Sequence, residues 1–339
     1  MDRDLQVTIP TAAMQGESAS KEGNGLSLFV STDPDLVAKP GANLDSWFLV
    51  GNLESDRGTM YLLVHLLHVT PPTGDDLLAA MVSVLNPQTN KYIAEEQDFP
   101  GEKCSFNTEK FEVITPIASA SGTTSALNFK GNWSKAGIEV DVTAQQTGPL
   151  LPNVGNGLFP CLGGITYHYA LPTMSVTGTV SISGDRYKVT GDGWLDRQWG
   201  VTPRFFGKEI KKWVWFGIIL DSGDRISVWE FIEEDRPVHS WATVVRLDGG
   251  VDVVACDPMT ANASNPWKSP ETGHIYPINW DIRIPQLDGH LIIRPEVIEQ
   301  EFVSPVGMHK YEGFSAITGT LRGKPVTGRV IIELVADWL

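Results

Sequence analysis

Short runs in which hydrophobic and polar residues alternate fill most of the chain after residue 45, and clusters of turn residues separate them. The runs are rich in aromatic and β-branched residues, as in 46–53 and 59–70, which the turn-like segment 54–58 joins. A period of two residues is typical of strands that bury one face. No stripe with helical spacing exceeds two turns. The pattern therefore predicts an all-β protein built from antiparallel hairpins.

A segment rich in Gly and Pro, residues 147–164, interrupts this succession of strands. Such a segment marks either a domain boundary or a loop that covers a cavity. Strand candidates lie on both sides of it, enough for a curved sheet or small barrel on each side. We predict an extended N-terminal arm (1–40) followed by two antiparallel β domains (41–165 and 166–339), each a barrel or a sandwich.

Composition narrows the range of partners. The 339 residues carry a net charge of −15, which argues against nucleic acid, because affinity for phosphates depends on Lys and Arg. A hydrophobic small molecule is the expected partner. The N-terminus lacks the apolar stretch of a signal peptide, and no run reaches the roughly 18 apolar residues of a membrane helix. We expect a cytoplasmic protein without a membrane span.

The sequence contains no recognisable metal or cofactor motif. Its three cysteines, Cys104, Cys161 and Cys256, are far apart and have neither a disulfide-framework nor a metal-ligand spacing. Gly-rich phosphate loops, serine elbows and Cys–His pairs are absent as well. We therefore expect no metal and no cofactor.

Residues 191–200, GDGWLDRQWG, combine two Trp, two Asp, an Arg and a Gln. A core strand tolerates such polar groups only where they are paired, and a surface loop has no need of two indoles. In an extended strand, alternate side chains share a face. One face would then hold Trp194, Asp196 and Gln198, and the other would hold Leu195, Arg197 and Trp199. We predict that the first of these faces lines a pocket.

The longer run 167–200 resembles the signature of the hydroxyneurosporene synthase-like family. Residues 45–58 resemble the family's early Trp-aromatic segment, with Phe48 in place of its second Trp. Residues 311–334 resemble its C-terminal Tyr-x-Gly and Glu-Leu pattern, although the usual Thr-Gly-Tyr ending is replaced by residues 335–337. This family includes carotenoid 1,2-hydratases and kievitone hydratase, and fungal lipocalin-like Diels–Alderases look like distant relatives.

The resemblance implies two lipocalin-like domains with a pocket at or near their junction. It also implies an enzyme of natural-product metabolism that protonates a carbon–carbon double bond, followed by hydration or cyclisation. That chemistry needs a carboxylic acid kept neutral by burial, aromatic faces that stabilise a cation, and a positioned water. The alternatives are a pericyclase, in which no proton reaches carbon, and a non-catalytic lipocalin-like carrier of hydrophobic ligands.

Asp196 matches the protonating Asp of the family and is the predicted acid. His168 and Tyr167 lie about as far upstream as the family's His and aromatic residue, and we predict catalytic roles for both. In a strand, however, Tyr167 and Tyr169 share a face and His168 takes the other. The predicted substrate-binding residues are Trp194, Gln198, Arg197, Trp199, Tyr169, Trp215, Glu230 and Trp47.

A structural role is the alternative for each of these residues. An Arg close to Asp196 would lower the pKa of Asp196 and argue against the acid role. A buried His168 often serves only to satisfy hydrogen bonds, and Trp213 and Trp215 are typical of a core between sheets. The weaker candidates are Trp47, His65, Tyr311, Glu312 and Glu333.

Overall fold

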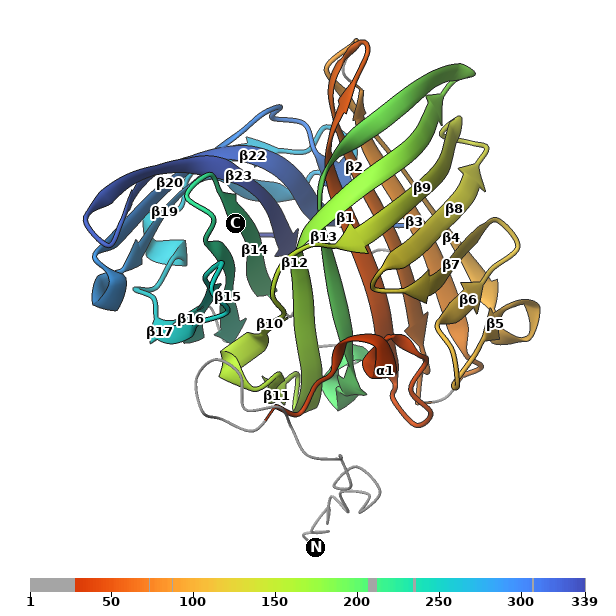
Figure 1. Cartoon of the computed structure of the whole chain (residues 1–339), viewed down its shortest axis with the longest axis horizontal. Coiled ribbons are helices and arrows are strands. Elements are labelled where there is room, and N and C mark those ends of the chain that lie inside the picture. Colours follow the sequence, from red (N-terminus) through yellow and green to blue (C-terminus); the bar gives the residue numbers. More distant parts are fainter. Residues whose placement is uncertain are drawn as a thin grey trace, which may run out of the picture.

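The computed structural model describes residues 28–72, 74–86, 88–206, 212–233, 236–306 and 308–338. It confirms the predicted fold class, because two antiparallel sheets of lipocalin-like character make up most of the chain (Figure 1). The helix α1 (Thr32–Leu36) precedes them. The predicted arm therefore contains a helix in its described part, and residues 1–27 of that arm lie outside the described residues.

The first sheet contains the strands from β1 to β13 in the order β4-β3-β2-β1-β13-β12-β9-β8-β7-β6-β5, with β10 and β11 paired to β12. These strands are β1 (Leu44–Ser55), β2 (Gly58–Val69), β3 (Leu77–Asn86), β4 (Lys91–Pro100), β5 (Ser105–Phe106), β6 (Glu112–Ile114), β7 (Ala118–Thr123), β8 (Ala126–Trp133), β9 (Ile138–Gln146), β10 (Leu151–Pro152), β11 (Leu158–Cys161), β12 (Gly164–Ile182) and β13 (Asp185–Val201).

The second sheet runs in the order β17-β16-β15-β14-β23-β22-β20-β19-β18, with β21 paired to β22. Its strands are β14 (Lys212–Leu220), β15 (Arg225–Glu233), β16 (Arg236–Val245), β17 (Val251–Ala255), β18 (Ser264–Lys268), β19 (Ile275–Ile284), β20 (Gly289–Pro295), β21 (Glu301–Phe302), β22 (Lys310–Leu321) and β23 (Lys324–Val335). Short 3₁₀ turns occur at η2 (Gly101–Lys103), η3 (Asn153–Gly155), η4 (Pro203–Phe206), η5 (Thr260–Asn262) and η6 (Pro285–Leu287).

The boundary between the sheets lies after Val201, and this corrects the predicted division at residue 165. Strands β12 and β13 belong to the first sheet, where β13 pairs with the whole length of β1, from Leu44 to Ser55. The Gly/Pro-rich segment is instead a loop that reaches the junction of the two sheets. Its backbone N–H at Val154 donates to Thr243 Oγ1 of β16 at 3.0 Å.

The two sheets repeat one plan, in which β12 and β13 correspond to β22 and β23. A two-residue turn closes each hairpin, and φ is positive at both residues of both turns, as a type I′ turn requires. In both hairpins a glycine allows the neighbouring strand to approach closely. A Cβ on Gly191 would lie 2.1 Å from the Asn52 carbonyl oxygen, and one on Gly328 would lie 2.2 Å from that of Ile219. The fifth residue after each glycine is Asp196 in one sheet and Glu333 in the other.

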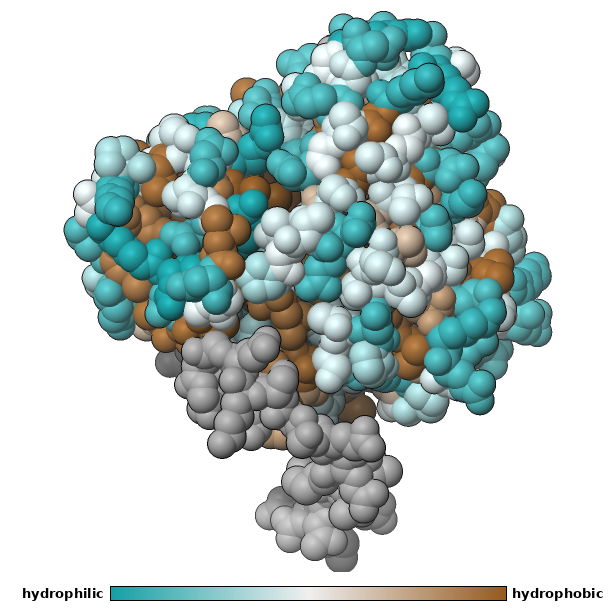
Figure 2. All heavy atoms as spheres, viewed as in Figure 1, coloured by the Kyte–Doolittle hydropathy of each residue, from teal (hydrophilic) through white to brown (hydrophobic). Residues whose placement is uncertain are grey.

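Each sheet curls around its own hydrophobic core, and a third buried cluster joins them. In the first sheet, Trp133 Nε1 of β8 donates to the Ala80 carbonyl of β3 at 3.0 Å, which links distant strands across the curl. The junction cluster combines Phe48 and Trp194 of the first sheet with Trp215 and Trp229 of the second. Hydrophobic residues are visible between the two lobes in Figure 2, whereas the outer hairpins are mostly hydrophilic.

Candidate functional site

One face of the GDGWLDRQWG run, in strand β13, points into the junction between the two sheets. Asp196 pairs in register with Phe48 of β1 and Ala170 of β12, and all three face the second sheet. Trp194, two residues earlier on the same face, contacts Trp215 of β14 with ring centroids 6.0 Å apart. The predicted division of this strand into two faces is confirmed, and the Trp194/Asp196 face is the one at the junction.

Asp196 is a buried carboxyl group with few polar neighbours. Its Oδ1 accepts a hydrogen bond from Trp194 Nε1 at 2.7 Å, and its Oδ2 lies 3.7 Å from His168 Nε2. Burial raises the pKa of Asp196 well above its ordinary value; the Trp194 hydrogen bond opposes this shift, and the charge of Glu333 adds to it. Burial therefore favours the neutral, protonated form of Asp196.

His168 is held neutral beside this acid. Burial lowers the pKa of His168 to about 3, and Nδ1 forms a short hydrogen bond with the side-chain amide Nδ2 of Asn153 in η3. An amide nitrogen is a donor, so Nδ1 is the acceptor and the proton of the neutral ring lies on Nε2, which faces Asp196. Asn153 and His168 thus orient a hydrogen-bond donor toward the carboxyl group.

Aromatic rings surround these polar groups. Trp229 of β15 meets the His168 ring edge-on at 5.5 Å and lies 6.3 Å from Trp215. Phe159 of β11 packs against both Trp229 and Trp241, with centroid distances of 5.9 and 5.3 Å. The faces of such rings carry partial negative charge and attract cations. We call the acid, its two polar neighbours and these rings the Asp196 site: Asp196, Trp194, His168, Asn153, Phe159, Trp215, Trp229 and Trp241.

A pocket opens beside Trp194 at the junction. It has a volume of about 250 Å³, including its part open to solvent. Strands β1, β13, β14, β22 and β23 line it with Val50, Asn52, Trp194, Gly217, Ile219, Phe314, Arg329, Val330 and Ile331. Trp194 both lines this pocket and donates to Asp196, so it connects the acid with a route to the surface.

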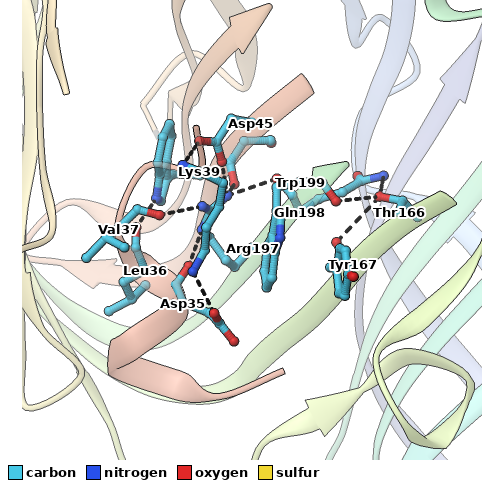
Figure 3. Close-up of polar contacts among 12 residues, drawn as sticks. Asp35, Leu36, Val37, Lys39, Asp45, Thr166, Tyr167, Arg197, Gln198 and Trp199 are labelled. Carbon is cyan, nitrogen blue, oxygen red and sulfur yellow. Dashed lines mark hydrogen bonds and ion pairs between the residues drawn. The ribbon is translucent and has the colours of Figure 1, made fainter. Parts of the chain in front are cut away.

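Arg197 lies on the opposite face of β13 and not in the site, which corrects its predicted role in binding substrate. It is fully buried and pairs with Asp45 (Figure 3). Its Nε and Nη2 donate to the carbonyls of Asp35 and Val37 at 2.7 and 2.8 Å, which fixes the end of α1 to the sheet. Because Arg197 is committed to Asp45, it leaves Asp196 without the Arg partner that would have argued against an acid.

Trp47 and Trp199 also lie on that opposite face, contrary to their predicted binding roles. The Arg197 guanidinium is 4.5 Å from the centre of the Trp47 ring and 4.8 Å from that of the Trp199 ring, so it is held between the two indoles. Tyr167 stacks on Trp199 at 5.2 Å, and the Tyr169 hydroxyl donates to the Thr32 carbonyl at 2.9 Å. Tyr167 and Tyr169 are therefore not beside Asp196, because strand alternation sends them to the core of the first sheet.

Glu230 is a further correction, since it faces the core of the second sheet. Its carboxylate accepts hydrogen bonds from the backbone N–H groups of Met259 and Thr260 at 2.6 and 2.9 Å and so anchors η5. Gln198 shares the face of His168 at the edge of the site, and its amide donates to Thr166 Oγ1 at 3.1 Å. Trp215, which we predicted to bind substrate, lies beside Trp194 at the junction.

Sequence reasoning missed Asn153, Phe159 and Trp241. The first two come from the Gly/Pro-rich loop, whose lack of periodicity gives no indication of which side chains point inward. The alternation of HSWATVVRL in β16 is the signal that indicates Trp241 faces the same way as Trp229, its partner in register. Within the described ranges, no group of His, Cys, Asp and Glu is arranged to hold a metal ion. No described helix has the length and apolar character to cross a membrane.

The raised pKa of Asp196 determines how the free energy of unfolding should depend on pH. Because the folded chain binds this proton more tightly than the unfolded chain, the stabilisation is complete below the pKa of unfolded Asp and is lost as pH rises through the folded value. We expect wild type to lose unfolding free energy relative to Asp196→Asn as pH rises, measured by urea denaturation at a series of pH values. A constant difference across the series would contradict the assignment.

The fold and site define a class: a double lipocalin-like β protein with a buried carboxylic acid among aromatic rings at the junction of its sheets. The chain belongs to the AttH-like family, which matches residues 30–336. It is 26% identical over 211 residues to kievitone hydratase of Fusarium solani subsp. phaseoli, a match covering 59% of this chain and 58% of that protein. It is 25% identical over 214 residues to dehydratase asqC of Emericella nidulans, covering 60% and 59%. Both matches thus span less than two thirds of the relative.

Solved structures share the fold. A structure described as a putative AttH from Nitrosomonas europaea superposes with a TM-score of 0.78 at 20% identity, covering 90% of this chain and 96% of that one. Kievitone hydratase from Nectria haematococca superposes with a TM-score of 0.77 at 21% identity, covering 91% and 94%. CghA with Sch210972 gives 0.52 at 12% identity, covering 87% and 89%. At these identities the likeness concerns the fold alone.

Proposed function

We propose that this protein is an enzyme of natural-product metabolism that acts on a carbon–carbon double bond of a hydrophobic small molecule. Asp196 is the acid, and hydration or cyclisation follows protonation. The observation that carries the proposal is a carboxyl group buried among indole and phenyl rings, which raises its pKa, with no Arg or Lys paired to it among the described residues. A carboxyl group at its ordinary pKa of about 4 would be ionised at neutral pH and unable to protonate an alkene.

The proposed reaction begins with transfer of the Asp196 proton to one alkene carbon, which leaves a carboxylate and a tertiary carbocation. The rings of Trp215 and Trp229 stabilise the cation by about 0.5–2 kcal/mol each without capturing it. The His168 Nε2–H and Trp194 Nε1–H face the two oxygens of the new carboxylate. In hydration, a water oxygen then bonds to the cation and one of its protons returns to the Asp196 carboxylate. In cyclisation, a second double bond attacks the cation instead, and the new carbocation that this forms loses a proton to the Asp196 carboxylate.

The names of the relatives support this reading. One is a hydratase and the other a dehydratase, and these are the forward and reverse directions of one acid-catalysed addition. The pocket beside Trp194 is far smaller than the roughly 300–1,000 Å³ of typical ligand sites. We therefore expect the aromatic side chains at the junction to rearrange when substrate binds.

Reaction in D₂O tests the proposal. The Asp196 proton exchanges with solvent, so an acid mechanism places deuterium on a carbon of the product, which mass spectrometry and NMR detect. Product formed without deuterium on carbon would instead support a pericyclic step, in which no proton reaches carbon. Binding of the ligand without any conversion would support a carrier.

A further inference from the structure

A second buried polar group lies at the same junction, on the other side of Phe48 and Trp215. We call it the Lys310 cluster: Lys310 and Glu312 of β22, Glu333 of β23, and His65, Ser83, Tyr92 and Glu96 of β2, β3 and β4. Phe48 meets the His65 ring edge-on at 5.1 Å and Trp215 at 5.8 Å. Trp215 in turn pairs in register with Glu333, and Glu333 with Glu312. The Phe48 and Trp215 rings thus lie between the cluster and the Asp196 site.

Acceptors outnumber donors in this cluster. Lys310 is buried and forms ion pairs with Glu312 and, at 3.4 Å, with Glu333. Burial works against its charge, but Glu312, Glu333 and Glu96 outweigh burial and raise the pKa of Lys310. Burial raises the pKa of Glu312 and of Glu96 to about 7 in each case, despite Lys310. One ammonium therefore serves three carboxyl groups, and an additional anion would be repelled.

Several polar atoms of the cluster are buried without a hydrogen-bond partner among the described residues. They are His65 Nδ1, Ser83 Oγ, Tyr92 Oη and Glu312 Oε2, and the Ser83 and Tyr92 hydroxyls lie near each other. Ser83 and Glu312 are fully buried, and His65 is 7% exposed. The great majority of buried polar groups in proteins have a hydrogen-bond partner, because leaving such a group unmet is energetically costly. These four atoms come from both sheets, on the faces that meet, and leave hydrogen-bonding capacity that a polar group of a ligand would satisfy.

We propose that the Lys310 cluster is a subsite for the uncharged, hydroxyl-bearing head of an amphipathic ligand whose alkene end lies at Asp196. A phenol or alcohol matches the cluster because its O–H donates to the Glu312 carboxylate and its oxygen accepts from Tyr92 or Ser83. A carboxylate or phosphate head has no proton to donate and meets Glu312 and Glu333. The location of the alkene end rests on the proposed function; the preference for a hydroxyl head does not.

The test uses three probes with the same prenyl chain: a prenylated resorcinol, its dimethyl ether and the corresponding prenylated benzoate. Isothermal titration calorimetry at pH 7 measures their affinities for the whole protein. We expect the resorcinol to bind about tenfold or more tightly than the diether, the ratio expected from a hydrogen bond to a charged group. We expect the benzoate to bind more weakly than the resorcinol.

Variants then assign the preference to the cluster. Ser83→Ala and Tyr92→Phe each remove one hydroxyl and should reduce the affinity for the resorcinol several-fold while sparing the diether. Glu312→Gln should abolish most of the preference, and thermal unfolding checks that it remains folded. Equal affinities for resorcinol and diether, tightest binding of the benzoate, no binding of any probe, or a preference that survives all three variants would overturn the proposal.

Asp196→Asn separates this inference from the proposed function. The variant should keep the preference for the resorcinol, because Asp196 is not part of the cluster. If the variant also kept full turnover, the acid mechanism would fail while the subsite would stand. If instead Asp196→Asn alone removed the preference, the head group would bind at Asp196, and the subsite would be refuted.

Discussion

Asp196→Asn is expected to lower kcat by about 10²–10⁴-fold, the range found when a general acid is removed. The amide has nearly the shape of the protonated carboxyl group but cannot release a proton to carbon. Trp194 Nε1 can still donate to the amide oxygen, so the strand and the aromatic rings should keep their positions. Steady-state turnover of the substrate that wild type converts measures the effect, and KM should change far less than kcat.

Asp192→Asn is the matched control for this variant. Asp192 lies on the same strand and the same face as Asp196, but its side chain is exposed. The Asp192→Asn variant should therefore retain wild-type turnover. Activity of Asp196→Asn above about a tenth of wild type would be incompatible with the 10²–10⁴-fold range and would refute the acid role.

Arg197→Ala is expected to cost about 3–5 kcal/mol of unfolding free energy, because it leaves a buried carboxylate without its partner. Asp45 is 1% exposed, and among the described residues its other contact is the Lys39 backbone N–H at 2.7 Å. The variant also removes the hydrogen bonds that fix Asp35 and Val37 to β13 (Figure 3). Urea denaturation monitored by Trp fluorescence measures the loss.

Arg57→Ala provides the comparison for Arg197→Ala. Arg57 also pairs with an Asp and lies over an aromatic ring, at 3.3 Å from Asp185 and 4.9 Å from the centre of Tyr187, but it is at the surface. Exposed pairs of this kind are screened by water, so its loss should be small by comparison. If the two variants lost similar stability, or if Arg197→Ala stayed fully stable and lost only substrate affinity, the structural role assigned to Arg197 would be wrong.

The period-two pattern was sufficient to predict the strands and, within β13, the face of each side chain. Alternation alone placed Trp194 and Asp196 together and Arg197 apart from them, and the register confirms both placements. The same rule put His168 on the opposite face from Tyr167 and Tyr169. The predictions that respected strand alternation correspond closely to the structure.

The predictions that failed concern partners distant in sequence. No sequence feature near Arg197 indicates that its partner is Asp45 on the neighbouring strand. Likewise, none near Glu230 indicates that its carboxylate binds the backbone of η5. The domain boundary was misplaced because a Gly/Pro-rich segment has the same sequence pattern whether it joins two domains or forms a loop at the junction between two sheets. The role of Asn153 could not be predicted either, because loop residues are positioned by tertiary contacts and not by a repeating pattern.

A direct measurement of the protonation state of Asp196 tests the central claim most closely. Carboxyl carbons of ¹³C-labelled aspartate shift on ionisation, and comparison with Asp196→Asn identifies the signal of Asp196 in NMR spectra recorded across pH. The structure predicts that this carboxyl group is still protonated at pH 7, while the exposed aspartates are ionised. A signal that titrates near pH 4, as in an ordinary Asp, would contradict the account.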